Sequence, residues 1–260
     1  MNPKIKVTIT TNELSTAIKE EMWELYRHYY FYDKAYFMQR TKSNTHFSFY
    51  RANGRLIGFT GLRINRTNVN GKRQFLVYFG QTVVHHDFRG KSLIPVTGAK
   101  LCMKFWKDLL CSNVYFWADA LTYKAYLVFA KTVDVMYPSC KAAMPAQVKA
   151  IVDHLGKLHY PDAYCPATGT VYKEKMLVND TNTQIPAKYQ LDKDIRFYVH
   201  ANPNFCKGHG LLTITPMNGS NVRQLLERYG QKMLGWKKVK ATMKRMLDRR
   251  IGPAFKLTSN

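Results

Sequence analysis

The segment that decides the fold lies at residues 74–95 and reads QFLVYFGQTVVHHDFRGKSLIP. Its first part, up to His86, is rich in β-branched and aromatic residues and predicts a strand. The polar turn DFRGKS follows at residues 87–92, and Pro95 then suits the first turn of a helix that we expect to reach about Leu110. The segment therefore predicts a strand, a basic glycine-containing turn and a helix in succession.

Two further strands are predicted before this segment, at residues 45–51 and 55–65. The dipeptides Asn53-Gly54 and Asn70-Gly71 separate the three strands. Asn-Gly readily supplies the positive φ angles of tight hairpin turns. We therefore expect an antiparallel meander of three strands.

The N-terminal part predicts a strand at residues 4–10 and a helix that Asn12 caps. Apolar residues recur there at three- and four-residue steps: Leu14, Ile18, Met22, Leu25 and Tyr29. The aromatic cluster at residues 29–38 has two interpretations, a second helix packed into the core or a wall that lines an apolar ligand.

After the central helix, a strand is expected at residues 113–118 and a helix at 122–132. Because a helix joins this strand to the third meander strand, the two should be parallel, with a right-handed crossover. Further helices are expected near residues 146–158, 221–234 and 236–249. The last two carry many Lys and Arg residues, so we divide the chain into a domain at 1–215 and a basic helical C-terminal extension at 216–260.

Composition narrows the class of protein. The chain has 260 residues, of which 46% are hydrophobic and 22% are charged, so neither a disordered nor a membrane-spanning protein is indicated. It holds 40 Lys and Arg against 17 Asp and Glu, a net charge of +23, which favours an anionic partner or substrate. The five cysteines contain no CxxC pair, and no signal peptide is recognisable, so we expect a cytoplasmic protein.

The basic turn is the motif that carries chemistry. Backbone N–H groups in such a turn and at the following helix N-terminus carry partial positive charge, and Arg89 and Lys91 add to it. Residues 89–93 (Arg89, Gly90, Lys91, Ser92 and Leu93) therefore form a candidate phosphate site. Such turns also occur without any ligand, so the order of the surrounding elements has to support the interpretation.

This order and the turn resemble those of the GCN5-related N-acyltransferase (GNAT) superfamily. The motif of that family is Arg or Gln, two variable residues, Gly, one variable residue, and Gly or Ala; it binds the pyrophosphate of coenzyme A. Here Arg89 begins the motif, while Ser92 and Ile94 replace the two small residues. The resemblance implies a GNAT fold, in the α/β (α+β) class, with a mixed, mostly antiparallel sheet whose two parallel central strands splay apart. Because of the two replacements, phosphopantetheine on a carrier protein, which has one phosphate, is an alternative donor to acyl-CoA.

A narrower resemblance covers roughly residues 20–215. Short stretches at 58–60, 82–84, 123–127, 136–138, 162–164, 194–197 and 202–203 are similar to GNAT-like fatty acyltransferases that lipidate ribosomally made peptides. This implies transfer of a medium- or long-chain fatty acyl group to a primary amine, such as a lysine or ornithine side chain. The implied partners are an acidic acyl carrier protein and a peptide acceptor.

The resemblance also implies site residues. The pantetheine arm would pair with Thr82, Val83 and Val84 like an added strand, and a backbone N–H near Val83 or Val84 would stabilise the oxyanion. The general-acid Tyr of the family aligns with Phe129, so Tyr126 or Tyr123, or no side chain, would take that role.

An amine nucleophile with a pKa near 10.4 needs a base, and His85 and His86 are the closest titratable residues in the sequence. As consecutive strand residues they would point to opposite faces, so we expect no shared metal ion and no metal cofactor. We slightly prefer His85 as the base, with Asp119, Asp134 and Glu174 as alternatives.

Other classes of function remain open at this point. Synthesis of an N-acyl amino acid uses the same fold with a free amino acid as acceptor. A nucleic-acid-binding module would account for the charge, although no known binding motif is present, and the basic C-terminal helices would suit peripheral contact with a membrane.

Overall fold

The computed structural model describes residues 4–173 and 184–233. Eight strands form a single mixed sheet in the order β1-β2-β3-β4-β5-β8-β7-β6. Their bounds are β1 Ile5–Thr11, β2 His46–Ala52, β3 Arg55–Val69, β4 Lys72–Val84, β5 Asn113–Ala120, β6 Tyr164–Cys165, β7 Thr170–Tyr172 and β8 His209–Pro216. All neighbouring pairs are antiparallel except β4 and β5, which are parallel. The predicted fold class is thereby confirmed.

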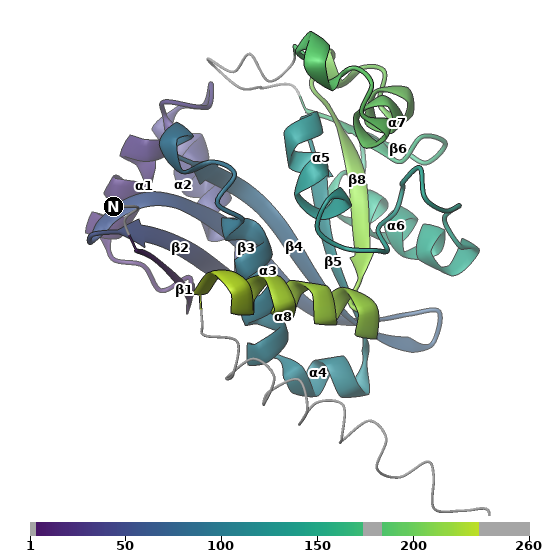
Figure 1. The fold of residues 1–260 in the computed structure, drawn as a ribbon, viewed down its shortest axis with the longest axis horizontal. Helices are drawn as coiled ribbons and strands as arrows, with labels where there is room; N and C mark the ends of the chain where they lie inside the picture. The colour runs from purple at the N-terminus through teal and green to yellow at the C-terminus, as the bar shows by residue number, and fades with distance from the viewer. Residues whose placement is uncertain (1–3, 174–183, 234–260) are drawn as a thin grey trace, which may run out of the picture.

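Helices cover both faces of the sheet (Figure 1). The described α-helices are α1 Thr16–Tyr26, α2 Lys34–Lys42, α3 Leu93–Lys104, α4 Trp106–Cys111, α5 Tyr123–Ala130, α6 Ala146–His159, α7 Lys193–Ala201 and α8 Gly219–Met233. α3 and α4 lie between β4 and β5, which confirms the helical crossover predicted between two parallel strands.

The meander forms for the reason that the sequence indicated. Asn53 and Gly54 have φ angles of 50° and 83°, and Asn70 and Gly71 have φ angles of 51° and 74°. Both tight turns therefore use the left-handed region at two successive residues, which Asn and Gly tolerate best.

Two local predictions were wrong. Ser15, and not Asn12, caps α1, because the Ser15 hydroxyl accepts from the backbone N–H of Ile18. The Asn12 amide instead donates to the carbonyls of Thr41 and Asn44. The single helix expected to reach Leu110 is divided at Phe105, whose φ of −107° and ψ of 35° depart from helical values.

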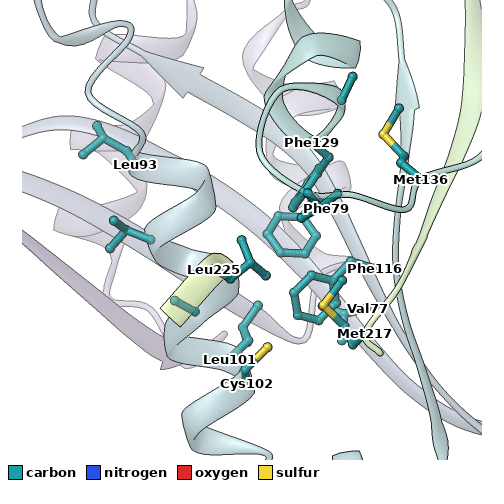
Figure 2. Packing of buried hydrophobic residues seen from close by; sticks show 14 of the residues in the cluster. Val77, Phe79, Leu93, Leu101, Cys102, Phe116, Phe129, Met136, Met217 and Leu225 are labelled. Carbon is teal, nitrogen blue, oxygen red and sulfur yellow. The ribbon is translucent and has the colours of Figure 1, made fainter. Parts of the chain in front are cut away.

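One face of the sheet carries the main hydrophobic core, which α3, α5, α7 and α8 cover. Figure 2 shows Phe79 of β4, Phe116 of β5 and Phe129 of α5 beside Leu225 of α8. The Phe79 ring lies 5.1 Å from that of Phe116 and 5.4 Å from that of Phe129, measured between centroids. This core connects the two parallel strands with the helices on either side of them.

The opposite face carries two separate hydrophobic clusters. One lies under α1 and α2 and includes Met22, Phe37 and Phe59. The other lies under α6 and includes Trp117 and Leu155. The boundary between these clusters falls near the point where β4 and β5 separate, and it holds the polar residues described below.

The C-terminal part contributes to the main core. Leu225 and Leu226 of α8 are buried in the same cluster as residues of α3, and Figure 1 shows α8 lying across α3. The proposed domain boundary between residues 215 and 216 falls at the end of β8 and stays a prediction. The helix expected at 236–249 lies outside the described residues. Within the described ranges, no helix combines the length and the apolar character that a membrane span requires.

Candidate active site

The two parallel strands separate part of the way along their length. β4 and β5 pair from Gln74 with Asn113 to Tyr78 with Trp117. Beyond these pairs β4 continues to Val84 and β5 to Ala120, and the described strands make no further backbone pairs with each other. Figure 1 shows them diverging toward the ends that follow these pairs. One edge of β4 is therefore left without a neighbouring strand.

A β-bulge accompanies the separation. Gly61 pairs with Gly80, but Phe59 pairs with Val83, so β4 carries one extra residue. Gln81 in the bulge has a φ of 46°. Its side chain accepts from the Asn44 amide at 2.7 Å and donates to the Thr41 hydroxyl at 3.2 Å. These buried hydrogen bonds from the end of α2 hold Gln81 in a conformation that a non-glycine residue rarely adopts.

The end of β4 directs alternate backbone groups to its two edges. The N–H of His85 donates to the Ile57 carbonyl at 2.8 Å, so the amides of His85 and Val83 face β3. The groups of Thr82 and Val84 therefore face the other edge. Of the three residues expected to contact pantetheine, only Thr82 and Val84 offer their backbone groups there.

Both outward carbonyls accept hydrogen bonds from side chains of this chain. The Tyr30 hydroxyl donates to the Thr82 carbonyl at 2.7 Å, and Arg89 Nε donates to the Val84 carbonyl at 3.2 Å. The Arg89 guanidinium also lies 5.0 Å from the centre of the Tyr29 ring. Arg89 thus folds back over the strand edge as well as belonging to the basic turn.

The basic turn has the backbone shape of an anion site. Gly90 and Ser92 have φ angles of 74° and 59°, and α3 begins at the next residue, Leu93. The first N–H groups of a helix have no partner inside that helix and point toward its N-terminal end. Arg89 and Lys91 are exposed and form no ion pair with a described residue. The turn therefore combines exposed cations with a helix N-terminus, and the phosphate site stays a prediction.

The prediction that His85 and His86 point to opposite faces was wrong. β4 ends at Val84, and His86–Phe88 form a 3₁₀ turn. The two imidazole rings stack, with centroids 4.2 Å apart. Their ligand nitrogens and the Asp87 carboxylate all lie within 4.8 Å of one another, so geometry does not exclude a shared metal ion.

His85 and His86 differ in their surroundings. Burial, and after it the neighbouring His86, lowers the pKa of His85, so that His85 is neutral at pH 7 and able to accept a proton. His86 is more exposed, and its Nδ1 lies 3.3 Å from the Tyr29 hydroxyl. Tyr29, which follows α1, thereby contacts a residue that follows β4.

The two candidate tyrosines and Phe129 lie in the main core. The Tyr126 hydroxyl donates to the Pro138 carbonyl at 3.1 Å, and burial raises the pKa of Tyr126. Tyr123 is 2% exposed. Phe129 contacts Phe79 and Phe116, which explains why an apolar ring suits this position.

A group of polar residues lies on the opposite face, between the two smaller hydrophobic clusters. We call it the polar junction, and its members are Arg40, Arg63, Tyr78, Asp119, His159, Tyr160 and Lys173. They come from α2, β3, β4, β5, the end of α6 and the end of β7.

Asp119 is the single carboxylate of the polar junction. Its side chain is 7% exposed and forms an ion pair with Lys173. The hydroxyls of Tyr78 and Tyr160 donate to it at 3.0 and 2.5 Å. Burial alone would raise the pKa of Asp119, but the Lys173 ammonium and the Tyr160 hydroxyl outweigh it and hold the pKa below its usual value. Asp119 is therefore an anion at neutral pH, and a weak base.

Of the other two alternative bases, only Asp134 lies in the described part of the chain. Asp134 is exposed and accepts hydrogen bonds from Ser220 and Gln224. Glu174 lies outside the described residues.

The aromatic cluster at residues 29–38 is partly core and partly surface. Tyr32 and Phe37 are buried, whereas Phe31 is 67% exposed. The rings of Tyr32 and Tyr36 stack at 4.4 Å, and the Arg40 guanidinium lies 5.9 Å from each ring centre. The core interpretation holds for the buried rings, and the ligand-lining interpretation stays a prediction.

Sequence reasoning missed most of the polar junction. It named Asp119 only as an alternative base and did not name Arg63 or Tyr160. A signal was present, because Asp119 interrupts the apolar strand NVYFWADA at residues 113–120. A charged residue in an otherwise apolar strand requires a buried partner. The sequence did not reveal that Lys173 and Tyr160 are those partners.

The sequence matches no protein-family model and no curated protein. Among solved structures it is similar to a ribosomal-protein-alanine N-acetyltransferase from Brucella melitensis (17% identity, TM-score 0.38, covering 55% of this chain and 96% of that one). An acetyltransferase from Trypanosoma brucei is similar at 14% identity and TM-score 0.38, covering 55% of this chain and 98% of that one. A probable N-acyltransferase from Enterococcus faecalis has 14% identity and TM-score 0.36, and the match covers 48% of this chain but only 32% of that one. At these levels of similarity, function has to be inferred from the residues of the site.

Proposed function

We propose that the chain is a cytoplasmic N-acyltransferase. It would move a fatty acyl group from acyl carrier protein or acyl-CoA to a primary amine, such as a lysine-type side chain of a ribosomally made peptide. One observation supports this most strongly: the unpaired edge of β4 ends directly at a basic turn and a helix N-terminus. An extended pantetheine arm can pair with a free strand edge, and the phosphate at the end of that arm requires an anion site beyond the end of the strand.

In this proposal Arg89 has two positions. In one position its Nε donates to the Val84 carbonyl, as in the structure. With donor it turns to the phosphate, where a charge-assisted bond is stronger, and releases the carbonyl to accept from a pantetheine amide. The outward N–H of Val84 is the donor best placed to stabilise the oxyanion, because the N–H of Val83 faces β3.

The reaction is direct attack of the amine on the thioester. The nitrogen forms a bond to the carbonyl carbon, the carbon–sulfur bond breaks, and the thiolate leaves and takes a proton from solvent. The amine gives up a proton to His85, which is neutral at pH 7 because burial lowers its pKa. This route requires no covalent enzyme intermediate.

Mass spectrometry of reaction mixtures tests the proposal. The purified full chain is incubated with acyl-CoA or acyl carrier protein, carrying chains from acetyl to palmitoyl, and with a panel of amines. We expect amide products that need both enzyme and thioester. If no donor and amine pair reacts, and the chain binds RNA or DNA with submicromolar affinity at about 0.15 M salt, the protein is a nucleic-acid-binding module instead.

A further inference from the structure

Two arginines of the polar junction make no close ion pair with a carboxylate of the described residues, although Asp119 acts on Arg40 at longer range. Arg40 and Arg63 form no ion pair there, and the only carboxylate of the junction, Asp119, is already paired with Lys173. The junction thus holds three cations, Arg40, Arg63 and Lys173, against one anion. A cation removed from water without a partner is unfavourable, so the junction has an excess of positive charge that an anionic ligand would balance.

The hydrogen bond between Arg63 and His159 fixes which ring nitrogen of His159 carries the proton. Arg63 Nη1 lies 3.4 Å from His159 Nδ1. A guanidinium can only donate, so Nδ1 accepts and the proton of the neutral imidazole is on Nε2. Burial, with help from Arg63, lowers the pKa of His159 to about 4, which keeps the ring neutral at pH 7. His159 Nε2 is therefore an N–H donor.

Two buried donors consequently lack acceptors. Neither His159 Nε2 nor Arg63 Nε has a hydrogen-bond partner among the described residues, although both atoms are buried. Buried polar atoms are nearly always satisfied, so an orphan pair in contacting residues calls for an acceptor that the described part of the chain does not supply. Both residues are partly exposed and each also contacts an aromatic ring: the Arg63 guanidinium lies 4.2 Å from the Tyr78 ring centre, and His159 stacks on Trp117 at 5.2 Å.

We infer that the polar junction binds a carboxylate of the acceptor through Arg63 and His159, so that the acceptor is an amine that also carries an acidic group. Arg63 pairs across the sheet with Tyr78, three residues before Gln81 in the bulge, so the carboxylate would lie beside the point where β4 and β5 separate. This inference rests on the proposed function. The carboxylate has two sources, the α-carboxylate of a free amino acid or an acidic side chain next to a lysine in a peptide.

Matched acceptors separate the two sources and test the inference. The first pair is lysine and lysinamide. The second pair is a blocked peptide in which glutamate precedes lysine and the same peptide with glutamine. We expect kcat/KM to be about tenfold or more higher for the acid than for its amide in at least one pair, because a hydrogen bond between two charged groups is lost in the amide. The pair that shows the difference identifies the source.

Variants assign the difference to the junction. Arg63→Gln and His159→Phe should each bring the acid-to-amide ratio of kcat/KM close to one. Arg66→Gln is the control, because Arg66 is on the same strand but pairs with Asp108 at the surface. Equal rates for acid and amide in the wild type, or an unchanged ratio in Arg63→Gln, would overturn the inference and leave the proposed function intact.

Stability and binding measurements distinguish a ligand site from a structural role. His159→Phe keeps an aromatic ring on Trp117 and removes a buried unsatisfied donor, but it also removes the acceptor of Arg63 Nη1, so its melting temperature should stay close to that of the wild type. A clear loss of stability would instead indicate that His159 is structural. If no amine reacts at all, the proposed function fails, and calorimetric titration with lysine, glutamate and their amides still tests the site. Acid binding that Arg63→Gln abolishes supports it, and no acid binding overturns it.

Discussion

Replacing Lys173 with Met should strongly destabilise the protein, because it leaves the Asp119 carboxylate buried without its cation. The Asp119 and Lys173 side chains are 7% and 13% exposed, so water screens their pair little. Breaking a buried ion pair from one side typically costs about 3–5 kcal/mol. For a chain of this size that corresponds to a drop in melting temperature of roughly 6 to 20 °C.

The pH dependence of the loss identifies its cause. In the wild type, the folded-state pKa of Asp119 lies below its unfolded value. Its stabilising contribution is therefore present above the unfolded pKa and lost as the pH falls through the folded pKa. In Lys173→Met burial dominates and raises this pKa, so the sign reverses. The deficit relative to wild type should be largest near pH 7.5 and should shrink toward pH 5, as Asp119 takes up a proton.

Urea unfolding at both pH values measures these differences. Lys173→Met combined with Asp119→Asn should recover much of the lost free energy of unfolding, because the uncompensated charge is gone. Lys149→Met is the control, since Lys149 is 39% exposed and its pair with Asp153 should contribute under about 1 kcal/mol. A Lys173→Met protein within about 1 kcal/mol of wild type, or one with the same deficit at both pH values, would refute the reasoning.

Three further outcomes are expected for the proposed reaction. Arg89→Ala with Lys91→Ala should weaken donor binding about tenfold or more, because phosphate contacts are lost. The control is Lys72→Ala with Arg73→Ala at the far end of β4, which should leave donor binding unchanged. An unaltered donor KM in the first double variant would contradict the phosphate site. Long acyl donors should react faster than acetyl donors if the aromatic residues at 29–38 line the chain, since each buried CH₂ contributes about 0.8 kcal/mol, and equal rates would assign those residues to packing alone. The rate should fall as the pH drops below the lowered pKa of His85, and a His85→Gln protein that keeps this pH profile would exclude His85 as the base.

Residue patterns predicted the parts of the fold that depend on neighbouring residues. Extended segments separated by two Asn-Gly turns predicted the β2–β3–β4 meander, and the helix that follows it predicted the parallel β4–β5 pair. The basic turn at residues 89–92 could also be recognised in the sequence, because its charge comes from adjacent side chains and one helix N-terminus. Such features can be predicted from the local sequence, without knowledge of the residues that pack against them.

Only the tertiary structure decided which distant residues meet. The chain is extended through Val84 and then turns, so two histidines expected on opposite faces stack on each other. Arg89 was expected to face a phosphate, and it also covers the Val84 carbonyl. Neither outcome depends on residue type alone, because each follows from the backbone path after β4.

The polar junction shows the same limit most clearly. Asp119 and Lys173 are 54 residues apart, and Arg63 and His159 are 96 residues apart. The strand order places them together. β8 lies between β5, which carries Asp119, and β7, which Lys173 follows. α6, which ends at His159, packs against β3, β4 and β5 on one face of the sheet. A local pattern shows that Asp119 needs a buried cation, but the long-range packing of the sheet selects Lys173 as that cation and leaves Arg63 without a carboxylate of its own.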